Sequence, residues 1–390
     1  MTPSPESAIR RTRRSRILVR STNWVGDAVM NMPAVQRLRE WNPEAHIGLV
    51  CPAKLHDLWR RNPFLNEVIP FVDSVDTGAL RQREFDLAVI LPNSFRSAWE
   101  CWQAGIPRRV GFAGHVRRWL LTDVVAEPRV EKFSHKTVTV SGLTFQIKSV
   151  AAQRHQIHRY LDLVSYLGGS PDFVPPKIYL AVEDMPPTST FFSHDGRLIV
   201  GLNAGAEYGP AKRWLADRFA KVAQLVSQEI DCRWVLFGGP GDVETARVIE
   251  DQLRAAGFDP GSILNLAGKT SLLELCTLIR CCAVLLTNDT GPMHLAGALG
   301  TPVVAVFGST SPELTGPLGD RDIVVRQPVE CSPCFLRECP IDFRCMERVT
   351  VEQVAEAVQK QLHRTIHSPL RTGKATPASS PPDDPGDHAD

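Results

Sequence analysis

The stretch that decides the fold spans residues 283–298 and reads AVLLTNDTGPMHLAGA. Its first four residues are apolar, as in a buried parallel strand, and a helix-like segment follows with Pro292 in its first turn, where proline is tolerated. Between them lie Asp289, Thr290 and Gly291. Their backbone N–H groups and the helix dipole would point at whatever lies above the strand end, which is the geometry that binds phosphate. We therefore expect an α/β fold that holds a nucleotide.

The same alternation of apolar runs and amphipathic segments occurs in both halves of the chain. Candidate strands span residues 16–20, 46–51, 67–71, 87–91, 198–202, 233–237, 283–287 and 303–307. Candidate helices span residues 28–41, 55–61, 215–230, 243–257, 272–280 and 351–363. This alternation is typical of parallel sheets with helices on both faces. We expect two doubly wound, Rossmann-like domains that face a central cleft, with ligands at the carboxyl ends of the strands.

Length and composition are those of an ordinary globular protein. With 390 residues the chain is longer than one core usually serves, which predicts two domains. Apolar residues make up 43%, charged residues 22%, and the net charge is +1, so nothing indicates a nucleic-acid partner. We expect neither a membrane span nor a signal peptide, because no apolar run of the required kind occurs. Ten scattered cysteines indicate the reducing cytoplasm rather than a disulfide scaffold.

Composition also shifts along the chain and predicts five segments. We expect a basic flexible tail over residues 1–15, a first Rossmann-like domain over 16–185, a second over 190–350, a helix over 351–365 and a disordered tail over 368–390. Arginines at positions 10, 11, 13, 14, 16 and 20 form either a solvated tail or a segment attracted to an anionic membrane surface.

The first polar motif, residues 21–27, reads STNWVGD and follows the first candidate strand. Gly26 allows a tight turn, and Asp27 falls at the start of the next helix. A carboxylate there is stabilised by the helix N-terminus, stays ionised and faces the cleft. Asp27 therefore either caps the helix, which the spacing alone favours, or acts as a general base toward a hydroxyl.

A second motif, residues 203–214, reads NAGAEYGPAKRW and follows the strand at 198–202. Gly205 and Ala206 are small enough to let a ligand approach the backbone. Lys212 comes just after them and would neutralise a leaving diphosphate, which is a large catalytic effect where negative charge develops. The alternative is a surface loop with solvated cations.

Two single residues are further candidates for ligand contact. Asp242 lies just beyond the strand at 233–237, where it either accepts hydrogen bonds from ribose hydroxyls or caps the next helix. His294 lies one turn into the helix after the phosphate-binding turn and is either structural or in contact with phosphate or sugar. The chain has neither a G-x-G-x-x-G motif nor a P-loop, so dehydrogenase and kinase hypotheses lose their usual support.

A cluster of four cysteines lies near the C-terminus. Its members are Cys331, Cys334, Cys339 and Cys345, with the spacing C-x2-C-x4-C-x5-C. The count suits a structural zinc site, but the spacing is not one of the standard pairs. Unliganded cysteines or occasional disulfides are the alternatives.

Taken together, these motifs resemble the ADP-heptose:lipopolysaccharide heptosyltransferases, which form glycosyltransferase family 9, and among them the heptosyltransferase II type. The similarity covers about residues 16–365 in order. The matching segments are residues 21–27, 91–98, 104–111, 205–214, 265–268, 287–294 and 307–318. Each motif alone is moderately specific, whereas the ordered set is highly specific, and residues 91–98 favour type II.

The resemblance implies a GT-B fold with an acceptor-binding N-terminal domain and a nucleotide-sugar-binding C-terminal domain. The implied enzyme is an inverting glycosyltransferase that moves heptose from ADP-heptose to the heptose of a lipid A–Kdo–heptose acceptor in lipopolysaccharide core biosynthesis. Its implied catalytic residues are the general base Asp27 and the phosphate-binding Lys212. The implied donor-binding residues are Gly205, Ala206, Asp242, Asp289, Thr290, Gly291 and His294. The implied acceptor-binding residues are Asn93, Ser94 and Arg96.

The resemblance also sets expectations for cofactors and surroundings. No cofactor is required, although weak assistance by magnesium and a structural zinc stay open. A lipid acceptor implies peripheral contact with the cytoplasmic face of the inner membrane. The alternatives are heptosyltransferase I or some other sugar-nucleotide transferase of the family. A non-catalytic module that binds a nucleotide or a metal is a further alternative. Residues 131–153 form either a variable surface loop or an aid in binding an anionic acceptor.

Overall fold

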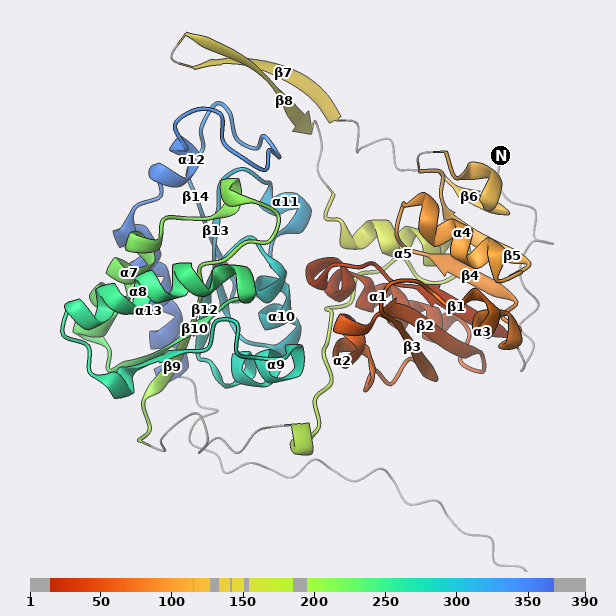
Figure 1. The fold of residues 1–390 in the computed structure, drawn as a ribbon, viewed down its shortest axis with the longest axis horizontal. Coiled ribbons are helices and arrows are strands. Elements are labelled where there is room, and N and C mark those ends of the chain that lie inside the picture. Colours follow the sequence, from red (N-terminus) through yellow and green to blue (C-terminus); the bar gives the residue numbers. More distant parts are fainter. Residues whose placement is uncertain are drawn as a thin grey trace, which may run out of the picture.

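A computed structural model describes residues 15–114, 116–126, 133–140, 142–150, 154–184 and 195–367. Apart from Ser15, the two expected tails, and with them the arginines at positions 10 to 14, lie outside the described residues. The described chain forms two lobes (Figure 1). No helix in it combines the length and the apolar character that a membrane crossing needs.

The N-terminal lobe is built on a six-stranded sheet with the order β3-β2-β1-β4-β5-β6. All its neighbouring strands pair in parallel. Its strands are β1 (Arg16–Arg20), β2 (His46–Pro52), β3 (Glu67–Phe71), β4 (Leu87–Ile90), β5 (Arg108–Phe112) and β6 (Asp123–Val125). This is the Rossmann order, in which the chain reverses direction across the sheet between β1 and β4 and leaves a crevice at their carboxyl ends.

Helices cover both faces of this sheet because alternate side chains of its central strand are buried on opposite sides. Ile17 and Val19 of β1 belong to one apolar cluster, and Leu18 belongs to another. The first cluster includes residues of α1 (Val25–Trp41), α2 (His56–Trp59) and α5 (Ile157–Tyr166). The second includes residues of α3 (Thr77–Gln82) and α4 (Phe95–Gln103).

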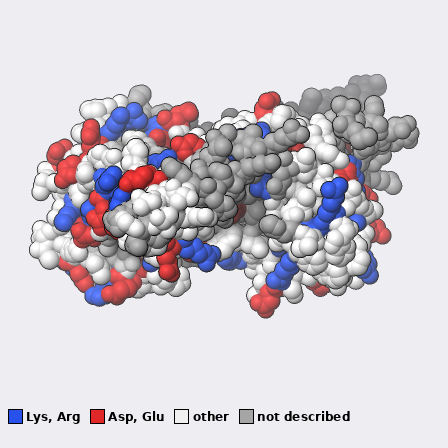
Figure 2. Space-filling view, turned by 90° about the horizontal axis from the view of Figure 1, so that it is seen from above, with Lys and Arg blue, Asp and Glu red and all other residues white. Residues whose placement is uncertain are grey.

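The C-terminal lobe repeats the design with the order β11-β10-β9-β12-β13-β14. Its strands are β9 (Leu198–Asn203), β10 (Cys232–Phe237), β11 (Ile263–Asn265), β12 (Val284–Asn288), β13 (Val303–Phe307) and β14 (Ile323–Arg326). Its helices are α7 (Ala216–Glu229), α8 (Val243–Ala255), α9 (Leu272–Cys281), α10 (Gly291–Leu299), α11 (Pro312–Thr315), α12 (Arg344–Glu347) and α13 (Val351–Ile366). Figure 2 shows basic and acidic side chains interspersed over this lobe, as the near-zero net charge leads one to expect.

A separate antiparallel hairpin of β7 (Phe133–Val140) and β8 (Leu143–Val150) projects beyond the two lobes (Figure 1). It accounts for most of the segment at 131–153. Whether it helps to bind an acceptor stays a prediction.

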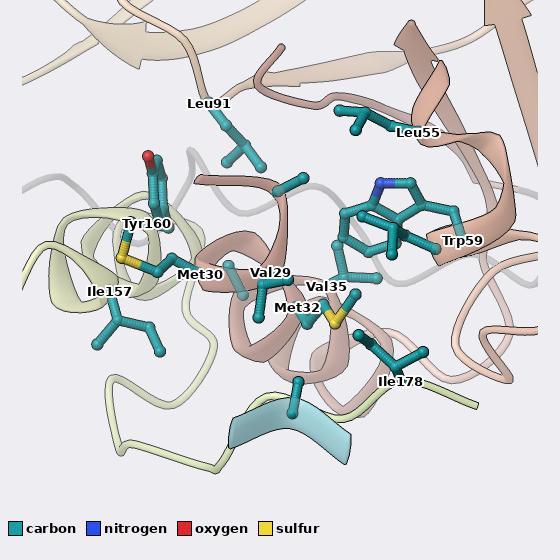
Figure 3. Packing of buried hydrophobic residues seen from close by; sticks show 14 of the residues in the cluster. Val29, Met30, Met32, Val35, Leu55, Trp59, Leu91, Ile157, Tyr160 and Ile178 are labelled. Atoms are coloured by element: carbon teal, nitrogen blue, oxygen red, sulfur yellow. The ribbon is translucent and has the colours of Figure 1, made fainter. Parts of the chain in front are cut away.

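The two lobes share one apolar cluster. Helix α1 packs against α10, and α2 packs against α9. Buried residues of both lobes, among them Val35 of α1 and Leu295 of α10, belong to the same cluster. Figure 3 shows the part around α1, where Tyr160 of α5 packs with its hydroxyl directed away from the apolar side chains. The lobes are therefore held together by apolar packing as well as by the chain connection.

The structure confirms the two parallel α/β domains that the sequence predicts. Every predicted strand is present and begins and ends within one residue of the expected position. Six strands were missed, namely β7 and β8 of the hairpin and β5, β6, β11 and β14 at the margins of the two sheets. Of the four sheet strands, β6 and β11 have only three residues, β14 has four, and β5 begins with two arginines, so none has a long apolar run.

Candidate active site

Asp27 lies at the cleft between the lobes, in the first turn of α1. The cap of this helix is Trp24 rather than Asp27, so the simple capping hypothesis is wrong. The Asp27 carboxylate instead accepts two side-chain hydrogen bonds from the start of α5. Gln156 Nε2 donates to Oδ1 over 2.5 Å, and the Tyr160 hydroxyl donates to the same oxygen over 3.2 Å. Gln156 Nε2 also donates to the Tyr160 oxygen over 2.8 Å, which ties the three groups into one network.

Burial is the dominant influence on this carboxyl group. Desolvation raises the pKa of Asp27 above its usual 3.8, and the hydrogen bonds from Tyr160 and Gln156 and the charge of Lys212 only partly oppose it. Burial therefore opposes the stabilisation that the sequence predicts from the helix N-terminus, and the ionised state of Asp27 stays a prediction. A carboxylate with a raised pKa is a stronger base, which suits proton abstraction from a hydroxyl.

Lys212 approaches the same cleft from the C-terminal lobe, after the loop that follows β9. Its Nζ donates to Asp289 Oδ2 over 2.6 Å, and Thr310 Oγ1 donates to the same oxygen over 2.6 Å. Lys212 Nζ also lies 5.1 Å from the centre of the Tyr208 ring. These contacts hold the ammonium group at the end of β12, beside the N-terminus of α10.

The two lobes touch at the β1–α1 turn and the β12–α10 turn. A Cβ atom on Gly26 would lie 2.7 Å from His294 Cδ2, and a Cβ atom on Gly291 would lie 3.1 Å from Val25 Cβ. Both glycines are thus needed for close approach. Burial lowers the pKa of His294 to about 4, so its imidazole is neutral at physiological pH.

A cavity of about 430 Å³ opens where these turns meet. The predicted site residues that line it are Asp27, Lys212, Asp289, Thr290, Gly291 and His294. These six residues come from both lobes and lie up to 267 positions apart in the sequence, from Asp27 to His294, yet they meet around one space.

A second cavity of about 500 Å³ shares Val25, Glu207, Thr290 and Gly291 with the first. Gly205 and Asp242 line it, as the donor-site prediction requires. Asp242 accepts from the Gly239 backbone N–H over 3.0 Å and from Arg213 Nη2 over 3.2 Å, and it makes no side-chain cap on α8. Ala206 is buried beside these residues and lines neither cavity.

The three predicted acceptor residues lie at the β4–α4 turn and line neither cavity. Asn93 Oδ1 accepts from Arg117 Nη2 over 3.3 Å, and Ser94 caps α4 by accepting from the Ser97 N–H. Arg96 Nε donates to Glu100 Oε1 over 3.1 Å. Since β4 is next to β1 in the sheet, this turn is adjacent to the β1–α1 turn, and an acceptor role stays a prediction.

Three residues of the first cavity or its rim were missed by sequence reasoning. Gln156 and Tyr160 belong to no motif and reach Asp27 only because α5 packs on α1. Arg337 lines the cavity, and its guanidinium carbon lies 5.3 Å from the centre of the Tyr208 ring. It is in the middle of the cysteine cluster, a position that could have drawn attention to it.

The cysteine cluster forms a loop over residues 331–345, which we call the Cys-rich loop. Its four cysteines line one small, mostly apolar cavity. Among the residues that the structure describes, no group of three or more His, Cys, Asp or Glu side chains is placed so that it could hold a metal ion. The zinc hypothesis thus gains no support and stays a prediction.

The backbone of the Cys-rich loop has a visible structural role. The Arg337 carbonyl accepts from the Ala211 N–H over 2.9 Å, and the Phe335 carbonyl accepts from the Tyr208 hydroxyl over 2.9 Å. The loop is therefore joined to the segment that carries Lys212.

Comparison with known proteins places this chain in a family. The model for glycosyltransferase family 9 (heptosyltransferase) matches residues 77–147 and 135–343. The chain belongs to glycosyltransferase family 9. It is a glycosyltransferase with a GT-B fold, as the resemblance in its motifs predicts.

Named relatives agree with the family assignment. Lipopolysaccharide heptosyltransferase 2 of Escherichia coli K12 is 32% identical over 329 residues, which cover 80% of this chain and 88% of that protein. Lipooligosaccharide heptosyltransferase 2 of Haemophilus ducreyi is 29% identical over 332 residues, with the same coverage of 80% and 88%. The structure of E. coli ADP-heptose lipopolysaccharide heptosyltransferase II matches with a TM-score of 0.72 and 28% identity, over 90% of this chain and 99% of that one.

Proposed function

We propose that this glycosyltransferase moves heptose from ADP-heptose to the heptose of the lipopolysaccharide inner core, as a heptosyltransferase of type II. The observation that carries the proposal is the meeting of Asp27 and Lys212, from opposite lobes, around one cavity. The names of the relatives, which are heptosyltransferases 2, support the choice of donor and acceptor.

Asp27 is the general base of this proposal. Gln156 and Tyr160 both contact Oδ1, so Oδ2 is the oxygen that takes the proton from the acceptor hydroxyl. As the proton moves to Oδ2, the hydroxyl oxygen forms a bond to the anomeric carbon of the donor heptose. The bond between that carbon and the β-phosphate oxygen breaks, ADP leaves with the electron pair, and the configuration at the anomeric carbon is inverted.

The departing diphosphate gains negative charge, and groups of the C-terminal lobe are arranged to stabilise it. Lys212 and Arg337 lie against the same Tyr208 ring and supply two positive charges at the cavity. The backbone N–H groups of Thr290 and Gly291 stand at the N-terminus of α10, which favours an anion. Fixed charges at the place where charge develops are a large part of catalysis.

The second cavity is proposed to hold the adenosine part of the donor. It continues from the first cavity through Thr290 and Gly291, so a diphosphate at this turn would lead into it. Asp242 at its wall is suited to accept hydrogen bonds from ribose hydroxyls. In this proposal no metal is required at the diphosphate, because protein cations serve there.

A lipid-linked acceptor would require the enzyme to work at a membrane surface. We place it in the cytoplasm with peripheral contact at the inner membrane, since the acceptor heptose is attached to lipid A in this proposal.

The decisive test combines product analysis with two variants. The protein is incubated with ADP-heptose and defined inner-core acceptors, and the products are identified by mass. We expect Asp27→Asn to bind ADP normally and to lose about a hundredfold to ten-thousandfold in turnover. Lys212→Ala should weaken ADP binding and turnover by about a hundredfold or more, whereas Lys221→Ala, on the exposed side of α7, should change neither.

Three results would contradict the proposal. Full activity of Asp27→Asn would remove the base assignment. Transfer only to an acceptor without the first heptose would favour heptosyltransferase I activity. Loss of turnover on chelation, restored by magnesium, would show that the protein cations are insufficient.

A further inference from the structure

Helix α4 and the short 3-10 turn at Arg118–Leu120 present a row of aromatic side chains to solvent. We call Phe95, Trp99, Trp102 and Trp119 the aromatic patch. The ring centres are 6.0 Å apart for Trp119 and Phe95, 5.9 Å for Phe95 and Trp99, and 4.8 Å for Trp99 and Trp102. Trp119 is 62% exposed, Trp102 43% and Phe95 42%.

The exposure of these rings is not needed to bury α4. The helix already packs Ala98 and Cys101 against the sheet, where both are fully buried. Phe95, Trp99 and Trp102 follow at intervals of four and three residues and form a second apolar stripe along the helix, in which Trp99 is half-buried against the core and Phe95 and Trp102 are exposed. Large aromatic side chains clustered on a surface indicate an interaction site rather than a folding requirement.

The exposed charges of α4 and of the segment at 116–120 are of one sign. Among the exposed residues at 94–103 and 116–120, Arg96 and Arg118 carry charge and no carboxylate is present. The one acid of α4, Glu100, is only 5% exposed and accepts from Arg20 Nε over 2.8 Å. The patch therefore offers aromatic rings and guanidinium groups; the exposed acid next to it is Asp73, whose backbone carbonyl accepts from Arg96 Nη2.

We propose that the aromatic patch inserts into the boundary between headgroups and acyl chains of an anionic lipid bilayer. Tryptophan is favoured at this depth because its ring is apolar and its N–H is polar. Arg118 would meet lipid phosphates, and Arg96, which also binds Glu100 and the Asp73 carbonyl, adds positive charge beside it. Attraction to an anionic surface adds to aromatic insertion. A soluble acidic protein could pair with the arginines, but such a partner would not explain why four aromatic rings lie next to one another.

The position of the patch in the fold agrees with this occupant. Phe95 begins α4 directly after the β4–α4 turn, and β4 is the neighbour of β1, whose following turn leads to Asp27. An enzyme docked through this patch would have the acceptor side of its cleft near the bilayer. The choice of a lipid surface rests in this respect on the proposed lipid-linked acceptor.

Vesicle binding tests the proposal with the full chain. Sedimentation is measured with vesicles of phosphatidylglycerol and phosphatidylethanolamine, and with phosphatidylcholine vesicles as the uncharged comparison. We expect the wild-type protein to bind the anionic vesicles more strongly than the phosphatidylcholine vesicles. Trp119→Ala and Trp102→Ala should each reduce partitioning into the anionic vesicles by about tenfold. Arg118→Gln should bind both kinds of vesicle equally. The matched control is Phe173→Ala, because Phe173 is 38% exposed and its ring centre lies 6.4 Å from that of His158 of α5, on the other face of the sheet.

Two further measurements make the outcome decisive. Brominated phosphatidylglycerol should quench the tryptophan fluorescence of the wild-type protein, which needs no variant. ADP binding and transfer to a delipidated acceptor should stay unchanged in Trp119→Ala, so failure of vesicle binding and failure of heptose transfer are separate results. Absence of vesicle binding, equal binding by the patch variants, or a dimer that dissociates when the patch is substituted would overturn the proposal.

Discussion

Tyr160 donates a hydrogen bond to the proposed base, and its removal should move the pH profile of the enzyme. Burial raises the pKa of Asp27, and the Tyr160 hydroxyl lowers it by stabilising the carboxylate. In Tyr160→Phe the stabilisation is lost and the burial remains, so the pKa of Asp27 must rise further. The acidic limb of kcat/KM, where the base becomes protonated, should therefore move to higher pH.

The size of the shift follows from the geometry. A hydrogen bond to a charged group contributes about 1.5 to 3 kcal/mol, and the 3.2 Å contact between the Tyr160 oxygen and Asp27 Oδ1 belongs at the weak end. About 1.4 kcal/mol corresponds to one pKa unit, so the acidic limb should move upward by about one unit. The plateau at high pH should change little, because Gln156 still holds the carboxylate.

The assay measures kcat/KM from steady-state transfer rates with the acceptor below saturation, across the acidic range. Tyr166→Phe is the matched control, since Tyr166 is on the same helix and donates to a different carboxylate, Asp123, over 3.3 Å. An acidic limb that stays in place in Tyr160→Phe would refute the reasoning. Equal displacement in both variants would also refute it, because the effect would then belong to α5 as a whole.

The remaining predictions concern the contact between the lobes, the second cation and stability. Gly26→Ala should reduce turnover at least tenfold, because its Cβ would lie 2.7 Å from His294; Gly297→Ala in α10, where the nearest atom is 4.0 Å away, should keep full activity. Arg337→Ala should weaken ADP binding by about tenfold in calorimetry, and unchanged affinity would remove it from the site. Asp27→Asn should unfold at a higher temperature than the wild type at neutral pH. Because the pKa of Asp27 is raised in the native state, the free energy of unfolding of the wild type falls as pH rises above 3.8. The difference in unfolding temperature between Asp27→Asn and the wild type should therefore narrow as the pH is lowered toward 3.8. If Asp27→Asn were less stable than the wild type at neutral pH, the stated effect of burial would be contradicted.

Local patterns in the sequence are sufficient to predict the two sheets and most of the residues that line the cleft. The apolar runs of β1, β9, β12 and β13 are followed by turns of small and polar residues, and parallel strands bring such turns to one edge. That reasoning placed Lys212 beside the phosphate-binding turn, where the structure also has it.

The missed features depend on packing between distant segments. Gln156 and Tyr160 are 129 and 133 residues from Asp27, so no spacing rule links them. The direction of the Asp27 pKa was also beyond local reasoning, because the helix N-terminus is visible in the sequence and the burial of the carboxyl group in the folded protein is not. Arg337 reaches the first cavity from the Cys-rich loop, whose four cysteines suggest a metal site rather than a phosphate contact.

The apolar cluster common to both lobes restricts how they can move. A hinge motion that parted α1 from α10 would expose apolar surface at about 25 cal/mol for each Å². Sliding of one helix along the other keeps that surface covered and so costs far less. Exchange of ADP for a new donor should therefore proceed by shear, with Gly26 and Gly291 as the points where the two turns pass each other. In such a molecule, substrate access depends on how easily α1 slides along α10. The flexibility of the connection between the lobes is then less important.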